Sequence, residues 1–172
     1  LYQYYISEEK DRLINAKKRY HANEIAPVTQ LFTPKWIVQY MVDNTLGQLW
    51  KEARPTTSVT KYLEFYINPA NETILLTREI KSPEEISFFD PCVGSAHILC
   101  YAYDVFQRIY EEEGYNNVEI PELIITKNLF GIDIDERAAQ IASFALMMKG
   151  RQHHSRFLKK GVIPNITAFR NI

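Results

Sequence analysis

Apolar residues recur along this chain with two different periods, and the two periods alternate. Three short, largely apolar runs at residues 86–89, 129–132 and 166–169 have the length and composition of buried strands. Between them, in residues 96–113 and 136–149, apolar side chains return every three or four positions, as on one face of an α-helix. A strand–helix–strand–helix–strand order predicts βαβ units, and therefore a parallel sheet in an α/β fold.

Residues with special turn chemistry mark the ends of these elements. Asp90 and Asp133 each follow an apolar run directly and end the first and second strands. Gly114 and Gly150 are expected to stop the two helices, because glycine readily takes the left-handed conformation in which many helices end. Asp135 is best interpreted as the N-cap of the second helix.

A third amphipathic segment precedes the first strand. Thr33 is a good N-cap and Pro34 suits the first helical turn, so a helix is predicted from there to about residue 50. Its apolar side is broad, and Lys35, Gln39 and Asp43 mark a narrow polar strip at i+4 spacing. Such a broad apolar side predicts burial against more than one neighbour.

Two other regions carry weaker patterns. Residues 7–24 are polar and compatible with a helix. Residues 54–83 are interpreted as a connector with local structure, containing a short helix near residues 62–66 and a turn at residues 68–71.

The composition is that of an ordinary soluble globular protein, with 46% hydrophobic and 24% charged residues among 172. No apolar run approaches the ~18–20 residues that span a bilayer, and no signal-peptide pattern opens the chain. With only Cys92 and Cys100, and no metal-ligand spacing among the four histidines, we expect a cytoplasmic protein without membrane contact or bound metal. Because the first residue is Leu1 rather than Met, we also expect that an upstream segment was removed.

The formal net charge of −1 is unusual for a module that grips DNA. Affinity for the phosphate backbone usually comes from a basic stripe, because binding releases counterions. Two short basic runs, in residues 17–19 and 149–160, are more typical of solvated helix faces. The composition of the chain alone is therefore not that of a DNA-binding module.

The loop after the first predicted strand suits a charged ligand. In parallel α/β folds, ligands bind at loops that join the carboxyl end of a strand to the next helix. Gly94 lets the backbone approach a ligand closely, and unpaired N–H groups at the helix start attract a carboxylate. Asp90 supplies the opposite charge, which suits an ammonium group. A ligand that bears both charges, such as the methionine end of S-adenosylmethionine, fits this loop.

The end of the second predicted strand suits a nucleoside. A carboxylate there can accept hydrogen bonds from both ribose hydroxyls, as in dinucleotide folds, and Asp133 is our choice for this role. Ile134 would then offer an apolar wall to the adenine ring. A dinucleotide is disfavoured, because the loop is not Gly-x-Gly-x-x-Gly and Asp133 lies far beyond the ~20-residue spacing. The missing Gly-Lys-Ser/Thr also removes a P-loop interpretation.

Each of these segments also has a purely structural explanation. Taken alone, Asp90 and Pro91 form a turn, Asp133 is a strand-end carboxylate, and Thr33 caps a helix. Their occurrence together, in this order and on a βαβ frame, makes the structural explanations much weaker.

Three motifs carry a resemblance to a known family. Residues 32–38 (Phe-Thr-Pro-Lys-Trp-Ile-Val) with 41–47 (Met-Val-Asp-Asn-Thr-Leu-Gly) resemble motif X of N6-adenine DNA methyltransferases. Residues 90–99 (Asp-Pro-Cys-Val-Gly-Ser-Ala-His-Ile-Leu) resemble their motif I, and residues 131–135 (Gly-Ile-Asp-Ile-Asp) their motif II. The sequence is most similar to the large methyltransferases of bacteriophage-exclusion systems and to fused type II restriction-modification enzymes, and less similar to type I modification subunits.

The sequence departs from the family pattern in two ways. Ala96 stands where the family usually has a second glycine, and we expect its methyl group to be tolerated if that position is already helical. The Asn-Pro-Pro-Tyr/Phe motif, which holds the flipped adenine in the family, has no counterpart: the only Asn-Pro, Asn68-Pro69, precedes motif I. We therefore expect the fragment to lack catalytic residues and to be inactive alone.

The resemblance implies a partial Rossmann-like class I methyltransferase sheet with N-terminal helices. It places an incomplete S-adenosylmethionine-binding domain at residues 31–172, and the sequence pattern before it predicts a helical segment at residues 1–30. Double-stranded DNA, the substrate that is methylated at adenine N6, would bind through other parts of the full-length protein, with restriction or phage-defence proteins as further partners. The residues expected at the cofactor are Thr33, Pro34, Asp90, Pro91, Gly94, Ser95, Asp133 and Ile134.

Two competing interpretations stay open at this point. The chain would be a degenerate cofactor fold used for assembly, or part of a methyltransferase that acts on RNA or protein. Retained ligand binding would argue against the assembly module. The catalytic motif of a longer chain would distinguish a methyltransferase acting on RNA or protein from one acting on DNA.

Overall fold

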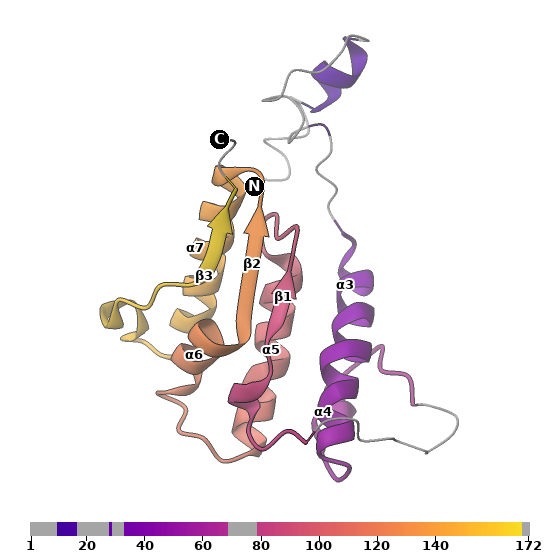
Figure 1. Cartoon of the computed structure of the whole chain (residues 1–172), viewed down its shortest axis with the longest axis vertical. Helices are drawn as coiled ribbons and strands as arrows, with labels where there is room; N and C mark the ends of the chain where they lie inside the picture. Colours follow the sequence, from indigo (N-terminus) through magenta and orange to yellow (C-terminus); the bar gives the residue numbers. More distant parts are fainter. Residues whose placement is uncertain (1–9, 17–27, 29–32, 69–78, 170–172) are drawn as a thin grey trace.

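Three parallel strands and the helices between them form the centre of the molecule (Figure 1). The computed structural model describes residues 10–16, 28, 33–68 and 79–169. The strands lie in the order β1-β2-β3, with every neighbouring pair parallel. These strands and their connecting helices are β1 (Phe88–Asp90), α5 (His97–Glu112), β2 (Leu129–Asp133), α7 (Glu136–His153) and β3 (Asn165–Ala168). The predicted α/β class and parallel sheet are confirmed, with strand ends within two residues of the prediction.

Helices α5 and α7 cover the same face of the sheet (Figure 1). Both βαβ crossovers place their helix on this side, as expected for consecutive parallel strands with connections of one hand. The apolar faces of the two helices meet the sheet in a single core, where Leu99, Phe106 and Leu146 are fully buried. The core therefore lies on one side of the sheet.

The two glycines that were expected to stop helices have different roles. Gly114 follows α5 with φ +80°, and the next N–H, of Tyr115, donates back to the Tyr110 carbonyl, so this stop is confirmed. Gly150 lies inside α7, which continues to His153, so the second prediction was wrong. A Cβ atom at Gly150 would lie 2.4 Å from ring carbon Cε1 of Phe157, so glycine is needed there for close packing.

The N-terminal helical segment begins one residue later than predicted and runs further. It consists of α3 (Lys35–Val42), the π-helical turn η1 (Asp43–Gly47) and α4 (Gln48–Ala53). Thr33 does not cap it: Pro34 occupies the N-cap position, its carbonyl accepts the Val38 N–H, and no side chain caps the helix. Because Pro34 holds an extended conformation with ψ 144°, the first helical residue is Lys35.

The last residue of the polar strip is part of the packed interface of this segment. Asp43 is fully buried, and its carboxylate accepts a hydrogen bond from the Tyr101 hydroxyl of α5. The predicted broad apolar side is only partly covered, because Val38 and Val42 are buried whereas Met41 is exposed. Hydrophobic periodicity identified the buried valines, but it did not reveal that Asp43, at the end of the polar strip, is buried against α5.

The connector and its neighbours contain short helical turns instead of the short helix predicted near residues 62–66. Helical geometry ends at Tyr62, and Leu63 is buried without being helical. Residues 10–15 are helical and residue 16 lies in a turn, whereas residues 7–9, 17–24 and residues 69–71 of the predicted turn lie outside the described residues. The short turns are η2 (Val59–Tyr62), η3 (Pro83–Glu85), α6 (Ile120–Leu123), η4 (Ile124–Asn128) and η5 (Phe157–Lys160).

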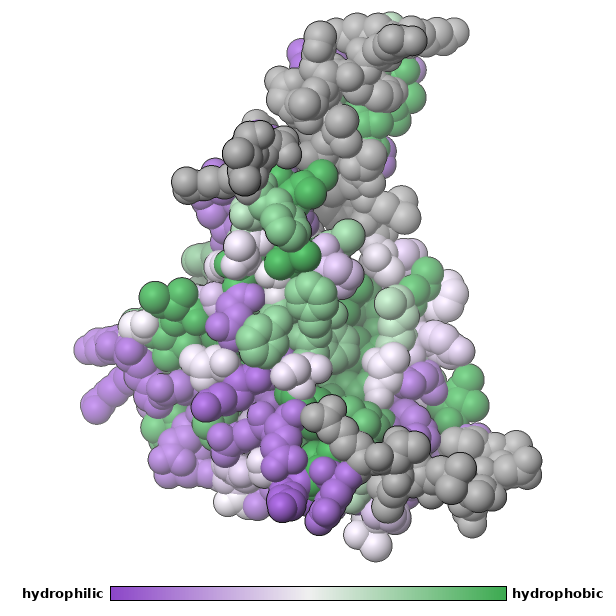
Figure 2. Space-filling view, in the orientation of Figure 1, coloured by the Kyte–Doolittle hydropathy of each residue, from purple (hydrophilic) through white to green (hydrophobic). Residues whose placement is uncertain are grey.

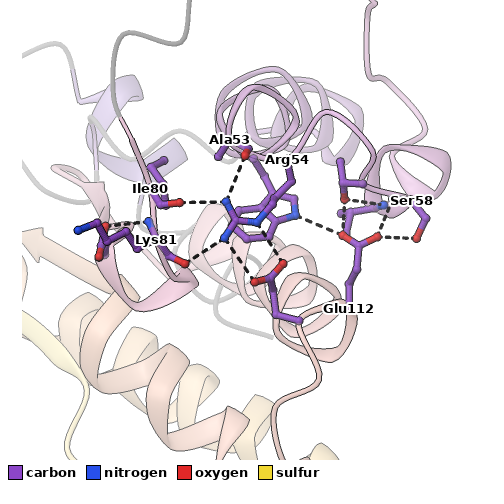
Figure 3. A network of polar contacts seen from close by, with 11 residues as sticks. Ala53, Arg54, Ser58, Ile80, Lys81 and Glu112 are labelled. Atoms are coloured by element: carbon purple, nitrogen blue, oxygen red, sulfur yellow. Dashed lines mark hydrogen bonds and ion pairs between the residues drawn. The ribbon is translucent and has the colours of Figure 1, made fainter.

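A polar junction fastens the connector to the end of α5 (Figure 3). The Glu112 carboxylate accepts hydrogen bonds from the Ser58 N–H at 2.6 Å, the Ser58 hydroxyl at 2.7 Å and the Thr57 hydroxyl. The indole N–H of Trp50 in α4 donates to the same carboxylate at 3.4 Å. Beside it, the Arg54 guanidinium reaches four acceptors: the Glu113 carboxylate and the carbonyls of Ala53, Ile80 and Lys81.

The second face of the sheet carries apolar side chains that no described helix covers. Figure 2 shows this face, with apolar side chains gathered over the strands. Phe89, Phe130 and Ile132 lie here around a shallow depression of about 510 Å³, and Phe89 is 54% exposed although its strand was predicted to be buried. Within the described ranges, every helix is too short or too polar to span a lipid bilayer.

Candidate cofactor site

The last residue of β2 joins the ends of two strands. The Asp133 carboxylate accepts the Gly94 N–H at one oxygen and the Asp135 N–H at the other, both at 2.8 Å. The first bond ties the loop after β1 to the carboxyl end of β2. The structure therefore brings Gly94 and Asp133 together at one edge of the sheet, although 39 positions separate them in the sequence.

A second carboxylate lies beside this junction. Asp90 ends β1, is only 6% exposed, and accepts the Cys92 N–H at 3.0 Å. Burial raises the pKa of Asp90, the Cys92 hydrogen bond opposes this rise, and the nearby Asp133 charge adds to it. Two neighbouring carboxylates, one of them desolvated, favour a positively charged group in front of them.

The loop between these carboxylates lies closely over β2. The Val93 N–H donates to the Ile132 carbonyl at 2.9 Å, and a Cβ atom at Gly131 would come within 3.0 Å of the Val93 side chain. Gly94 follows with φ +51°, and its outer side is open, since a Cβ atom there would meet nothing within 4 Å. The backbone at Gly94 is therefore free to meet a ligand, as a close approach requires.

Ala96 departs from the expectation that its position is helical. It is the N-cap of α5 and has φ 64° and ψ 31°, in the left-handed region. Its methyl group is fully buried in the core. A glycine would take this conformation without strain, which is a physical reason for glycine to be usual here.

The other predicted residues line the surroundings of this edge. Ile134 is 62% exposed next to Asp133, Pro91 is exposed in the loop, and Ser95 is half-buried. Asp135 caps α7, because its carboxylate accepts the Arg137 N–H at 2.9 Å, so this prediction is confirmed.

Thr33 and Pro34 line a separate cavity of about 590 Å³ between α3, α5 and α7. They share it with His97, the first residue of α5, so they lie near the loop without touching Asp133 in the described contacts. Sequence reasoning missed several residues of this cavity, including Tyr101, Asp104 and Lys149. His97, Tyr101 and Asp104 repeat at helical spacing, which was the available signal, whereas Lys149 reaches Asp104 at 2.6 Å from another helix.

Comparison with known proteins gives this arrangement a family. The family model of the MmeI DNA-methyltransferase domain matches residues 68–166, more than half of the chain. The chain belongs to this methyltransferase family. The resemblance to adenine-specific methyltransferases inferred from the three motifs is confirmed by two relatives that carry this name.

These relatives are much longer than the chain. It is 44% identical over 177 residues to the adenine-specific methyltransferase BrxX of Escherichia coli O9:H4 (strain HS), an alignment that covers 99% of the chain and 14% of BrxX. It is 41% identical over 178 residues to the adenine-specific methyltransferase PglX of Lacticaseibacillus casei (strain Zhang), with 96% of the chain and 15% of PglX covered. The methyltransferase chain thus spans about a seventh of these relatives.

Proposed function

We propose that this chain is the S-adenosylmethionine-binding part of an adenine-specific DNA methyltransferase in a restriction-modification or phage-defence system. The observation that carries the proposal is the contact of Asp133 with Gly94, which unites two of the three motif segments at one sheet edge. The parallel strands, with helices after β1 and β2, support a Rossmann-like class I sheet within residues 31–172. The names of the two relatives support adenine methylation.

Asp133 is the proposed ribose partner. Each of its carboxylate oxygens already accepts one backbone N–H and keeps capacity for another hydrogen bond. The backbone bonds hold the carboxylate in one orientation, so it would meet the two ribose hydroxyls without losing side-chain freedom on binding. Ile134, which projects beside it, would cover the adenine ring.

The amino-acid end of the cofactor would lie at the beginning of α5. The helix dipole favours its carboxylate there, and the buried Asp90 favours its ammonium group. Thr33, Pro34, Pro91 and Ser95 complete the proposed walls. None of these residues does the chemistry.

Methyl transfer from the sulfonium to adenine N6 needs no metal, only proximity, orientation and a flipped base. In this proposal the chain supplies the position of the methyl donor. Other parts of the full-length protein would hold the base and contact the double-stranded DNA. Restriction or phage-defence proteins would also bind to those other parts. An assembly module with a degenerate fold would have lost cofactor binding, whereas a methyltransferase acting on RNA or protein would keep it.

The experiment that tests this function is calorimetric titration with S-adenosylhomocysteine, in wild type and in Asp133→Asn. We expect the wild type to bind and Asp133→Asn to bind at least about tenfold more weakly, because charge-assisted hydrogen bonds contribute roughly 1.5–3 kcal/mol each and ~1.4 kcal/mol is a decade. Asp135→Asn is the matched control, since asparagine caps a helix about as well as aspartate and should change affinity little. Absence of binding by the folded wild type would refute the proposal.

The ribose contact itself is separated from loop support by changing the ligand. Asp133→Asn also loses one of the two backbone acceptors, so it loosens the Gly94 loop. In the wild type, the 2′-deoxy analogue of S-adenosylhomocysteine should bind more weakly than S-adenosylhomocysteine. In Asp133→Asn, the two ligands should bind with equal affinity. If the ratio of the two affinities is the same in both proteins, Asp133 supports the loop without touching the ribose.

A further inference from the structure

The hydroxyl group of Tyr101 forms a polar link between α5 and the N-terminal helical segment. It donates to Oδ1 of Asp43 at 2.8 Å, and the Gln39 side chain lines the same cavity as Tyr101. Gln39 and Asp43 are one helical turn apart, the last two members of the polar strip that the sequence pattern marks. The second Asp43 oxygen accepts the Phe65 N–H at 2.9 Å. The polar strip therefore meets α5 at the side chain of Tyr101.

This link fixes how the two helices are placed against each other. The Asp43 carboxylate is fully buried, so leaving it without hydrogen-bond donors would cost its full desolvation penalty. Apolar contacts such as that of Val38 are non-directional and tolerate a small rotation or slide of one helix past another. The hydrogen bond from Tyr101 to Asp43 does not, because the strength of a hydrogen bond falls steeply with angle.

The link lies close to the proposed cofactor site. Tyr101 stands one turn after His97, the first residue of α5, and Gln39 stands about one turn after Pro34. The cavity of about 590 Å³ is lined from both helices at these beginnings, by Thr33 and Pro34 on one side and His97 and Tyr101 on the other. Rotation of α3 would therefore move Thr33 relative to the beginning of α5.

We propose that Tyr101 is a positioning residue for the cofactor: its hydrogen bond to Asp43 holds Thr33 and Pro34 at the beginning of α5, against the amino-acid end of the ligand. This inference rests on the proposed function. It assigns to the polar strip a role in cofactor affinity in addition to helix packing. The nucleoside end of the cofactor, which Asp133 would hold, is not affected by Tyr101 in this proposal.

Two ligands distinguish this role from a general effect on the fold. S-Adenosylhomocysteine has the amino-acid end, whereas 5′-methylthioadenosine lacks it and keeps the nucleoside. We expect Tyr101→Phe to bind S-adenosylhomocysteine about three- to tenfold more weakly than wild type and to bind 5′-methylthioadenosine equally well. Calorimetric titration measures both affinities, and urea denaturation measures stability.

Tyr110→Phe is the matched control. Tyr110 lies on the same helix, is fully buried where Tyr101 is half-buried, and loses a comparable hydrogen bond, to Asn128 at 2.9 Å. Its partner precedes β2, at the opposite end of that strand from Asp133. We expect this variant to lose stability and keep both affinities. Asp43→Asn, which keeps the size of the acceptor and removes its charge, should also weaken binding of S-adenosylhomocysteine alone, and it tests the proposal if Tyr101→Phe does not fold.

The possible results separate the two proposals. A wild-type protein that binds neither ligand overturns the proposed function and this inference with it. Wild-type binding together with unchanged affinities in Tyr101→Phe overturns the inference alone. An equal loss for both ligands, or a similar loss in Tyr110→Phe, also overturns it, because the hydroxyl then acts through overall stability.

Discussion

At the residue scale, Ala96 combines an unfavourable backbone conformation with a well-packed side chain. Among the described residues it is the only non-glycine residue with a positive φ. The left-handed conformation costs an L-residue roughly 1–2 kcal/mol, while burying one methyl group contributes about 0.8 kcal/mol. The two effects are similar in size, so the alanine is tolerated at the turn into α5.

A pair of alanine-to-glycine variants tests this balance. Ala102 is as buried as Ala96 but lies inside α5, so Ala102→Gly should cost about 2 kcal/mol from lost helix propensity and lost methyl burial. Ala96→Gly relieves the left-handed strain and should lie within about 1 kcal/mol of wild type. Urea denaturation measures both, and equal losses would show that Ala96 is not strained.

Single residues at strand ends were predictable from the sequence, and side-chain partners were not. Asp133 and Gly94 follow from a local pattern: an apolar run that ends in a carboxylate, and a glycine in the loop before a helix. The bond between Tyr101 and Asp43 joins residues 58 positions apart, and no local period encodes it. Lys149 was assigned to a solvated basic run, but it pairs with Asp104 in the cavity wall.

At the scale of elements, the crossing of α7 and η5 depends on the missing side chain of Gly150. A helix-interior glycine is normally improved by alanine by about 1 kcal/mol. Here Gly150→Ala should destabilise by about 1–3 kcal/mol, because the added Cβ atom would meet the fully buried ring of Phe157. The measurement is the urea midpoint of the variant.

A double-mutant cycle shows whether the ring is the cause. In a Phe157→Leu background, the same Gly150→Ala change should be neutral or stabilising, because the clashing ring is gone. A similar loss in both backgrounds would place the obstacle elsewhere in the helix.

The junction at Glu112 should make the attachment of the connector depend on pH. Burial raises the pKa of this carboxyl, but the hydrogen bonds from Thr57, Ser58 and Trp50 together outweigh it and lower the pKa from its ordinary value of 4.5. The ionised group therefore stabilises the fold above about pH 4.5, and this contribution is lost as pH falls through the lowered pKa.

Glu112→Gln should accordingly lower the urea midpoint at pH 7, and the difference from wild type should shrink toward pH 3. Partial solvent exposure limits the loss at pH 7 to on the order of 1–2 kcal/mol. Glu64→Gln, at an exposed position of the connector, is the control and should change little. A loss that is constant with pH would mean that the carboxylate charge does not matter.

The existence and order of the elements were predictable, but their orientation was only partly so. Hydrophobic period located the strands and α5 and α7, since each buries a repeating face against its neighbours. The period does not say which polar side chain is buried: the strip of Lys35, Gln39 and Asp43 was recognised, but the burial of Asp43 against α5 was not. Gly150 was taken as a stop because its partner, Phe157, is set by tertiary packing.

At the scale of the whole molecule, the uncovered face of the sheet should control association. Exposed apolar side chains on a sheet with open edges promote contact between copies. We expect the chain to self-associate as its concentration rises, and Phe89→Lys to reduce this association while leaving stability unchanged, because Phe89 is largely exposed. Sedimentation velocity over a concentration series measures the effect.

Phe144→Lys provides the comparison. Phe144 is 66% exposed on α7, on the other side of the sheet, and its substitution should leave sedimentation unchanged. If both lysine variants, or neither, alter association, the uncovered sheet face is not the contact surface.

The hydrogen bond between Asp133 and Gly94 also has a consequence in time. The two residues are 39 positions apart, so a ribosome adding ~5–20 residues per second makes Asp133 about 2–8 s after Gly94. During that interval the nascent loop after β1 lacks the Asp133 carboxylate that accepts its Gly94 N–H. The nascent chain should therefore begin to bind the ligand only when β2 pairs with β1. Ligand binding by stalled nascent chains of increasing length would show the chain length at which these two strands assemble.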